Sequence, residues 1–515
     1  MGLTVLDFVR YHKDLKGTKI GCREGDCGAC TILVGELVNG KVKYRTMTSC
    51  LMPLANAAGK HIVTVEGINP EDGSLTPVQQ AMVDESGTQC GFCTVGFVMS
   101  LTGYCIDCVS SPHVCKGSVA ASISAIDGNI CRCTGYKSIE RAAETLCRQL
   151  AEGSRQSEEF VPQYFASIKD RLGNIHATDR QLLTDNRQLF VSGGTDVYVQ
   201  KPDTMAETES SHLFYDEHLR GIRDLGDTIE IGASATVTDL LESSVIQTIF
   251  PDLYQHLKLV SSTPIRNMAT LAGNFVNASP IGDMTVWFLA LDAEITLSSP
   301  PYKGGVADAS SDGVVLSSPQ DSSANDKERT TPPFGHPSFS KEGSFDLPAS
   351  SNGAVLREMK LRDLYLGYKQ LAKADDEYIT TIRFLKPTGD FRFNFEKVCK
   401  RKYLDIATAN TAISLVLSEP GAIATGSSES KIQNLKSKID VAHVSAGGVA
   451  PIPLYLKETS AFLCGRQITD ETVEQANEIM QSEISPISDV RGTEAYKRLL
   501  LRQLFTAHFV ELFDL

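Results

Sequence analysis

The chain opens with short runs of β-prone residues bounded by glycine and other turn residues, and this pattern predicts a small sheet within residues 1–75. The clearest runs lie at 31–34 and 61–65. From Thr76 to about residue 150 the apolar residues follow a helical spacing instead. Thr76 can cap the first helix because a proline, which is favoured at the first helical position, follows it. We therefore expect a helical unit directly after the sheet.

Beyond this unit the pattern becomes mixed α/β. The polar stretch 151–159 predicts an interdomain linker. Residues 299–355 hold 7 of the 21 prolines together with several serine pairs. Such a composition buries too little apolar surface to offset chain entropy, so we expect a disordered surface insertion that is dispensable for chemistry. In the C-terminal portion the pattern predicts a strand at 440–446 and helices at 471–480 and 494–509.

Length and charge narrow the class of protein. At 515 residues the chain should hold about three or four domains. Its net charge of −14 disfavours a nucleic-acid or anionic-membrane surface, so the expected partners are small molecules or proteins. No stretch approaches the ~20 apolar residues that a membrane span requires, and the first residues lack the features of a signal peptide. We therefore expect a cytoplasmic location.

Cysteine usage then becomes informative. The chain has 14 cysteines, and eleven of them fall between Cys22 and Cys133. In a reducing compartment such thiols bind metal more often than they form disulfides. We therefore expect the metal chemistry in the N-terminal part of the chain.

The first group of cysteines is Cys22, Cys27, Cys30 and Cys50, with the spacing C-x4-C-x2-C-x19-C. The C-x4-C-x2-C part matches the plant-type 2Fe-2S loop, in which four thiolates hold two irons. Glycines 21, 25 and 28 let the backbone adopt positive φ and approach the sulfurs closely enough to donate N–H hydrogen bonds. A structural zinc site in the same thiolates is the alternative, although zinc gives no reason for the glycine-rich loop.

The second group pairs a C-x2-C motif with a C-x-C motif. Its members are Cys90, Cys93, Cys131 and Cys133. Two such loops at the ends of helices would hold a second 2Fe-2S cluster, and the positive ends of the helix dipoles would favour its negative charge. We expect the remaining cysteines to be free thiols that pack helices, with a third metal site at Cys105, Cys108, His113 and Cys115 as the alternative.

Several motifs together resemble the iron-sulfur and flavin subunit of the molybdenum hydroxylases, and of the xanthine dehydrogenases in particular. They extend over nearly the whole chain outside the 299–355 insertion. The motifs are GCREGDCGAC, QCGFC followed by GFVMSL, GNICRCTGYKSIERA, SGGTD, IRNMATLAGNFVNASPIGD and SDVRG. The family normally has further ferredoxin strands before Leu3, so either the start is misassigned or the sheet has an unpaired edge.

The resemblance implies an α+β multidomain fold. The expected units are a plant-type ferredoxin β-grasp at 1–75, a four-helix 2Fe-2S domain at 76–150, an FAD-binding α+β domain of the vanillyl-alcohol-oxidase type at 160–390, and a C-terminal α/β flavoprotein domain at 395–515. It also implies two 2Fe-2S clusters, FAD, and NAD+ as acceptor. The molybdopterin centre would lie on a large partner subunit, because this chain ends after the flavin part, and two such heterodimers would associate.

By the same resemblance, a set of residues would contact FAD. Residues 190–197 would hold the diphosphate, the TLAGN segment would contact the phosphates and ribityl chain, and Asp283 would bond hydroxyl or ring groups. The full set is Phe190, Val191, Ser192, Gly193, Gly194, Thr195, Asp196, Val197, Thr270, Leu271, Ala272, Gly273, Asn274, Asp283, Ile379 and Lys397. Taken alone, the Gly-Gly-Thr turn favours a plain loop, and the TLAGN segment shifts the balance toward a phosphate site. We expect Arg266 to form an internal salt bridge.

The expected function is to pass electrons from the partner's molybdenum centre through two clusters to FAD and on to NAD+. No acid or base in this chain needs to act on the organic substrate, so we expect no catalytic residues here. The alternatives are the same subunit of an aldehyde- or N-heterocycle-oxidising relative, or an iron-sulfur carrier without enzymatic activity.

Overall fold

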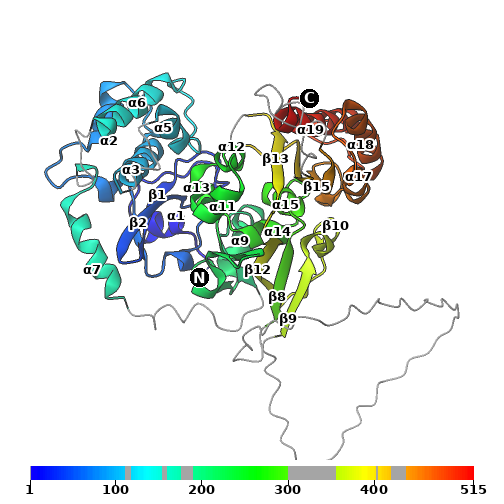
Figure 1. Ribbon diagram of the computed structural model, residues 1–515. Helices are drawn as coiled ribbons and strands as arrows, with labels where there is room; N and C mark the ends of the chain where they lie inside the picture. Colours follow the sequence, from blue (N-terminus) through cyan, green and yellow to red (C-terminus); the bar gives the residue numbers. More distant parts are fainter. Residues whose placement is uncertain are drawn as a thin grey trace, which may run out of the picture.

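A computed structural model gives the fold and places three parts side by side (Figure 1). They are named after the expectations above: the iron-sulfur part lies before residue 176, the flavin part runs from 189 to 385, and the C-terminal part runs from 390 to 515. It describes residues 2–110, 118–152, 159–175, 189–299, 355–401, 404–418 and 437–515. The predicted insertion lies outside these residues except for its two end positions, which belong to strands. Most of the predicted linker lies outside them as well.

The first unit is a small antiparallel sheet. Its strands are β1 (Thr31–Val38), β2 (Lys41–Thr48) and β3 (His61–Val63), in the order β2-β1-β3. A short helix α1 (Val5–Asp7) and a π-helix (Phe8–His12) precede them. Their apolar side chains share one hydrophobic core with Val191, Tyr198 and Met268 of the flavin part. The sheet is therefore packed into the flavin domain rather than tethered to it.

The second unit is helical, as the apolar spacing predicts. Its helices are α2 (Pro77–Asp84), α3 (Thr94–Ser110), α5 (Val119–Ala125) and α6 (Lys137–Ala151), and α7 (Ile168–Gly173) follows. Thr76 caps α2 through a complete capping box with Gln79, which satisfies two backbone donors at the helix start. Short 3₁₀ turns occupy Leu54–Ala57, Val65–Ile68, Gln163–Ser167, Glu217–Leu219 and Leu361–Leu364.

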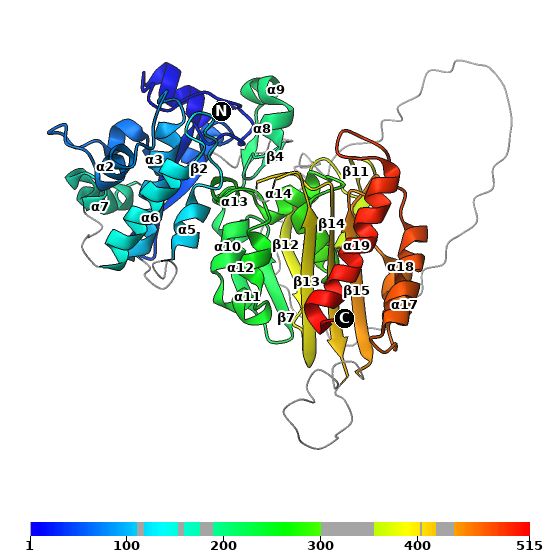
Figure 2. The same ribbon diagram turned by 90° about the horizontal axis from the view of Figure 1, so that it is seen from above.

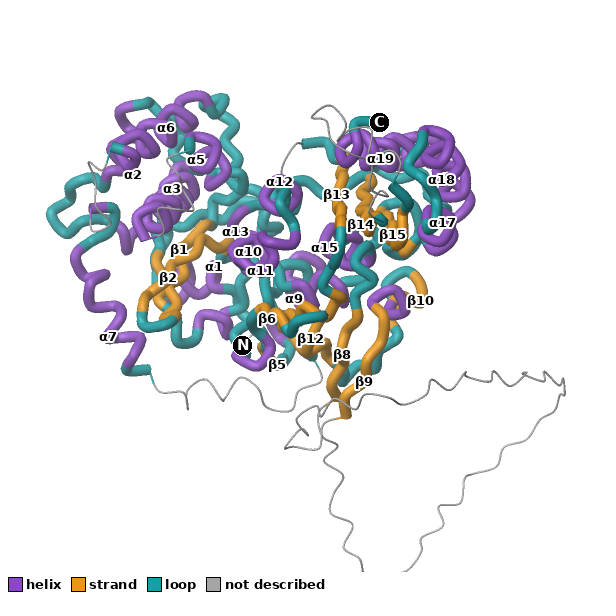
Figure 3. Tube along the Cα trace, viewed as in Figure 1, coloured by secondary structure: helices purple, strands orange, loops and turns teal. Residues whose placement is uncertain are grey.

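The flavin part combines a five-stranded antiparallel sheet with short helices (Figure 3). The sheet order is β6 (Ile222–Asp224), β7 (Thr228–Gly232), β12 (Tyr378–Leu385), β8 (Glu294–Ser299) and β9 (Val355–Lys360). Two small pairs are β4 (Phe190–Val191) with β5 (Ser211–His212), and β10 (Tyr365–Gly367) with β11 (Gln370–Leu371). Because β8 and β9 pair directly, the insertion connects two neighbouring strands.

The helices of this part are short. They are α8 (Val197–Gln200), α9 (Pro202–Glu207), α10 (Val237–Glu242), α11 (Ser244–Ile249), α12 (Leu253–Leu257), α13 (Thr263–Arg266), α14 (Leu271–Val276) and α15 (Asp283–Leu289). Trp287 of α15 is buried against Phe393 at a ring distance of 4.3 Å. This contact joins the core of the flavin part to the last unit.

The C-terminal unit is a four-stranded antiparallel sheet with three helices along one face (Figure 2). Its strands are β13 (Asp390–Val398), β14 (Ala409–Leu417), β15 (Ile439–Gly447) and β16 (Leu454–Tyr455), and its helices are α17 (Lys457–Leu463), α18 (Asp470–Glu483) and α19 (Glu494–Phe513). Helix α15 packs against the same sheet. The predicted strand and both predicted helices of this portion are confirmed.

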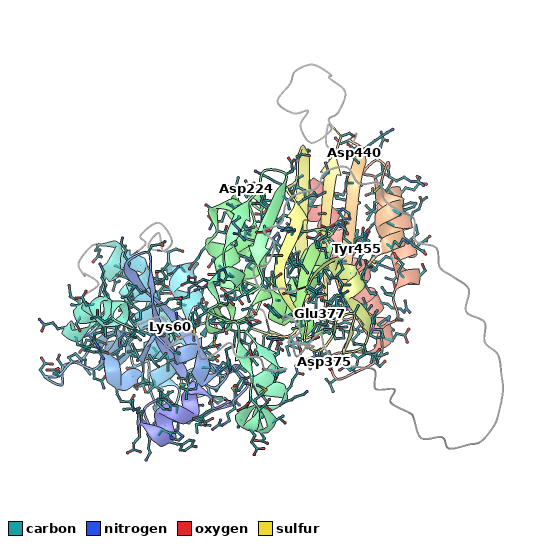
Figure 4. All side chains as sticks on the ribbon, turned by 90° about the horizontal axis from the view of Figure 1, so that it is seen from below. Lys60, Asp224, Asp375, Glu377, Asp440 and Tyr455 are labelled. Atoms are coloured by element: carbon teal, nitrogen blue, oxygen red, sulfur yellow. The ribbon has the colours of Figure 1, made fainter. Side chains whose placement is uncertain are left out.

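Figure 4 labels Lys60 in the iron-sulfur part, and Asp440 and Tyr455 in the C-terminal part. The ammonium group of Lys60 lies 3.7 Å from the ring centre of Tyr215 and pairs with Glu36. The contact with Tyr215 ties the first unit to the flavin part a second time. Across the described segments, no helix has the length and apolar character that crossing a bilayer requires.

Candidate functional site

The first cysteine group gathers at the glycine-rich loop before β1. The backbone N–H groups of Glu24 and Asp26 donate to Cys22 Sγ over 3.3 and 3.4 Å, and Cys22 N–H donates to Cys27 Sγ over 3.4 Å. The hydrogen bond with the Cys27 thiol and these backbone donors lower the pKa of Cys22 to about 5. The loop therefore favours the thiolate, which is the form that binds metal, at Cys22, whereas the same hydrogen bond raises the pKa of Cys27.

The other two thiols of this group, Cys30 and Cys50, are buried and interact with one another. Cys50 follows β2, so the strand pairing of β1 with β2 brings it to the loop. Two of the three predicted glycines, Gly25 and Gly28, have positive φ, whereas Gly21 does not. A Cβ at Gly21 would instead lie 2.5 Å from Cys27 Sγ, so a side chain there would displace the sulfur.

The second group gathers at the ends of helices α3 and α6. Cys90 and Cys133 lie with their sulfurs 3.5 Å apart, and Cys93 interacts with Cys131. The Thr134 N–H donates to Cys131 Sγ over 3.5 Å. Helix α3 begins directly after Cys93, so its positive end faces the thiols. Both Cys90 and Cys133 are exposed, which leaves this site at the surface of the chain.

The cysteines come together in pairs. The pairs are Cys22 with Cys27, Cys30 with Cys50, Cys90 with Cys133, and Cys93 with Cys131. Among the described residues, no three or more Cys, His, Asp or Glu side chains surround one point as they would around a single ion. In a 2Fe-2S cluster each iron takes two protein ligands, whereas structural zinc takes four. The paired arrangement fits the cluster better than zinc.

The two cysteine loops touch each other. The Ile130 N–H donates to the Cys27 carbonyl over 3.0 Å, and the Asn129 side chain donates to the Gly28 carbonyl over 3.2 Å. A Cβ at Gly28 would clash with the Gly128 carbonyl, so this approach requires glycine. Only one hydrogen bond and one peptide unit therefore separate a ligand of the first group from Cys131 of the second.

A cleft of about 1130 Å³ lies between the first cysteine loop, the flavin part and the C-terminal unit. Glu24, Gly25 and Asp26 of the loop line it on one side, and Arg401, Gly448 and Asp489 line it on another. Its volume and its position between units are typical of a site for a dinucleotide-sized ligand.

The predicted glycine turn reaches this cleft. Thr195 and Asp196 line it, and a Cβ at Gly193 would clash with the Met268 carbonyl. Gly194 has a φ of +82°, which L side chains rarely adopt. The preceding residues Phe190 and Val191 form β4, which pairs with β5. Positions 193 and 194 therefore require glycine, and a turn with such close backbone approach suits a diphosphate better than a plain loop does.

The second predicted FAD segment, residues 270–274, contributes one residue to the lining of the cleft. Thr270 caps α14 by accepting from Gly273 N–H, and Asn274 lines the cleft, where its Oδ1 accepts from Thr285 N–H over 3.1 Å. Leu271 is buried in the hydrophobic core. Ile379 is also buried, opposite Leu297 in the sheet. Of the predicted segment the structure therefore brings only Asn274 to the cleft lining, and Thr270, Leu271, Ala272, Gly273 and Ile379 lie outside it.

Asp283 lines the cleft and has two side-chain partners. Lys397 Nζ lies 2.7 Å from Asp283 Oδ2, and Asn410 Nδ2 donates to Oδ1 over 2.6 Å. Lys397 also donates to the Leu259 carbonyl over 2.8 Å. Lys397 thus does not line the cleft, but it holds Asp283, which does. Sequence reasoning missed Asn410, whose buried Oδ1 has no partner of its own, because nothing in its surroundings marks it.

Two further expectations concern residues outside the cleft. Arg266 forms the expected internal salt bridge, with Nη2 lying 2.8 Å from Asp127 Oδ2, and both side chains are buried. Cys105 and Cys147 are buried free thiols, as expected. Cys108, in contrast, is disulfide-bonded, so the expectation that all remaining cysteines are free was wrong for this residue. His113 and Cys115 lie outside the described residues.

Comparison with known protein families agrees with this geometry. Residues 64–144 match a [2Fe-2S] binding domain, residues 175–306 match an FAD binding domain in molybdopterin dehydrogenase, and residues 395–512 match a CO dehydrogenase flavoprotein C-terminal domain. The chain belongs to the molybdenum hydroxylase family of oxidoreductases and carries its iron-sulfur and flavin electron-transfer domains.

Among curated relatives, the chain is similar to xanthine dehydrogenase of Blastobotrys adeninivorans, at 25% identity over 98% of this chain and 39% of that protein. It is 28% identical to xanthine dehydrogenase of Emericella nidulans, over 91% of this chain and 34% of that protein. The chain thus spans less than two fifths of these relatives. Among solved structures, a CO dehydrogenase from Oligotropha carboxidovorans aligns at 22% identity with a TM-score of 0.46, over 65% of this chain and 93% of that chain.

Proposed function

We propose that this chain is the electron-transferring part of a xanthine dehydrogenase. In this proposal it receives electrons from a molybdenum-pterin centre on a large partner subunit and delivers them through two 2Fe-2S clusters and FAD to NAD+. The observation that carries the proposal is the continuity of the three sites. A hydrogen bond from the Ile130 N–H to the Cys27 carbonyl joins the two cysteine loops, and Gly25 and Asp26 of the first loop line the cleft.

Each group of residues has a distinct role in the proposal. The first cluster would be held by Cys22, Cys27, Cys30 and Cys50, the second by Cys90, Cys93, Cys131 and Cys133, and FAD by the 190–197 turn with Thr270, Asn274 and Asp283. When bound, these groups supply one-electron transfer at the clusters and two-electron transfer at the flavin. The protein contributes thiolates, amide donors to sulfur, and a cleft that holds Asp283 in one orientation.

The exposed second cysteine group is where the electron donor would dock. Cys90 and Cys133 are exposed, and Phe92 between the ligands of the C-x2-C motif is 47% exposed. Exposed ligands place this group where a donor protein can approach it. At the opposite end of the path, NAD+ would take the electrons from FAD in the cleft. In this proposal electrons would pass from the exposed second cysteine group, through the first cysteine group, to the cleft.

The identity of the organic substrate rests on the relatives alone. Both xanthine dehydrogenases are low in identity, and about three fifths of their length has no counterpart in this chain. The atoms that touch the substrate would belong to that part. An aldehyde- or N-heterocycle-oxidising partner is therefore the alternative outcome of the test.

The test is to isolate the full chain from its native source under anaerobic conditions, together with whatever binds it. We expect about four iron atoms and one FAD per chain, co-purification with a molybdenum-containing protein, and reduction of NAD+ that depends on xanthine. Reduction of NAD+ that depends on an aldehyde and not on xanthine would show that the substrate is an aldehyde. Iron without flavin would instead support a carrier that lacks the proposed activity.

A further inference from the structure

Two loops from opposite walls of the cleft meet through one ion pair. Arg401 Nη2 lies 2.9 Å from Asp26 Oδ1, and the same nitrogen lies 3.2 Å from Asp405 Oδ1. Asp26 directly precedes Cys27 in the first cysteine loop, whereas Arg401 follows β13 in the C-terminal part. Asp26 and Arg401 both line the cleft. The ion pair is thus a direct contact between the loop of the predicted first cluster and the C-terminal wall of the cleft.

Asp26 is fixed beside the thiols through its backbone, and Arg401 is fixed to Asp26 by the ion pair. The backbone N–H of Asp26 donates to Cys22 Sγ over 3.4 Å, so its carboxylate is fixed to the loop that surrounds the sulfurs. Reduction of an iron-sulfur cluster adds negative charge, and nearby charges and hydrogen bonds set its potential. A carboxylate at this position therefore opposes reduction, and a guanidinium paired with it favours reduction.

We propose that Asp26 and Arg401 form an opposed charge pair that sets the reduction potential of the first cluster while it holds the cluster loop against the flavin cleft. This inference rests on the proposed function, because it requires a cluster in the first cysteine group. Asp26 and Arg401 are positioning residues, since neither is a ligand. Their side chains are 42% and 44% exposed, so dissolved salt should weaken the effect without removing it.

A plain structural tether and a tuning pair give different results. If the pair only holds the loop, then Asp26→Asn and Arg401→Gln break the same contact and should shift the potential in the same direction. If the charges tune the cluster, then Asp26→Asn should raise the potential and Arg401→Gln should lower it. The double variant should return toward the wild-type value, and Arg401→Lys, which keeps the charge, should stay near it.

The experiment is a redox titration of the first cluster by electron paramagnetic resonance, on the full chain with both cofactors, at low and at high salt. Asp14→Asn is the matched control, because Asp14 is an exposed carboxylate paired with Lys16 outside the cleft. We expect no shift for this control and opposite shifts for the two cleft variants that shrink at high salt. Shifts of equal sign, or none, would overturn the inference. A wild-type chain without any cluster signal would overturn the proposed function instead.

Discussion

At the residue scale, the glycine turn at the cleft has no tolerance for a side chain. A Cβ at Gly193 would meet the Met268 carbonyl, a backbone atom that cannot rotate away. Forcing a methyl group into such a contact typically costs about 1–3 kcal/mol. The residue type at this one position therefore decides whether the turn can keep the shape that suits a diphosphate.

We expect Gly193→Ala to purify with much less FAD than the wild type and to unfold at a lower temperature. The ratio of flavin absorbance to protein absorbance, together with a thermal melt, measures both effects. Gly173→Ala is the matched control, because a Cβ at Gly173 meets nothing within 4 Å. Full FAD retention by Gly193→Ala would show that the turn does not hold the diphosphate.

At the element scale, helix α13 docks on the helical iron-sulfur unit through a buried charge. Arg266, at the end of α13, reaches Asp127 with side-chain exposures of 6% and 3%. The same guanidinium also donates to the carbonyls of Val260 and Ser261. Removing one partner of a buried pair leaves an uncompensated charge, which typically costs about 3–5 kcal/mol.

The expected result for Asp127→Asn is therefore a large loss of stability with the cysteines intact. Urea unfolding measures it. Glu140→Gln provides the comparison, because it removes one partner of the surface pair Lys137–Glu140 and should change the free energy of unfolding by less than about 1 kcal/mol. Equal effects of the two substitutions would mean that the buried pair does not fix α13.

The elements themselves were largely predictable from local pattern. The capped start of α2 at Thr76, the strand that contains 440–446 and the helices at 471–480 and 494–509 all carry a clear signal of spacing or capping. The contacts between elements were not. The sequence around Asp26 does not predict its contact with Arg401, and the sequence around Cys27 does not predict its contact with Ile130. Such contacts depend on tertiary packing.

In the candidate site, too, local features could be predicted from the sequence and tertiary contacts could not. Cysteine spacing predicts the ligands that share a loop, because these must follow one another closely along the chain, whereas Cys50 reaches its loop only through the pairing of β1 with β2. Asn410 carries no such signal, since a single asparagine in an apolar strand looks like any other polar residue in a sheet. Its role follows only from the hydrogen bond to Asp283.

At the scale of the whole molecule, a buried polar chain joins the flavin part to the C-terminal helix. His256 contacts Asn394, Asn394 donates to His508 Nδ1 over 3.1 Å, and His508 contacts Thr411. Complete burial lowers the pKa of His508 from 6.5 to about 3. The unfolded chain therefore binds a proton between these pH values that the folded chain excludes, so this contribution to stability is complete above about pH 6.5 and declines as the pH falls.

From pH 7 to pH 5 we expect the wild type to lose stability more steeply than His508→Gln, by at most about 1.4 kcal/mol per pH unit. Urea midpoints measured at matched pH values give the difference, and titrations common to both proteins cancel. His218→Gln is the control, because His218 is exposed. Parallel pH dependences for the wild type and His508→Gln would contradict the assignment.

The central claim is that two cysteine quartets hold two 2Fe-2S clusters in line with a flavin cleft. Low-temperature electron paramagnetic resonance of the reduced full chain, with spins counted against FAD content, tests it most directly. The account predicts two distinct signals that integrate to about two spins per chain, and loss of one of them with unchanged FAD in Cys27→Ser. A single signal, or a Cys27→Ser spectrum identical to that of the wild type, would contradict it.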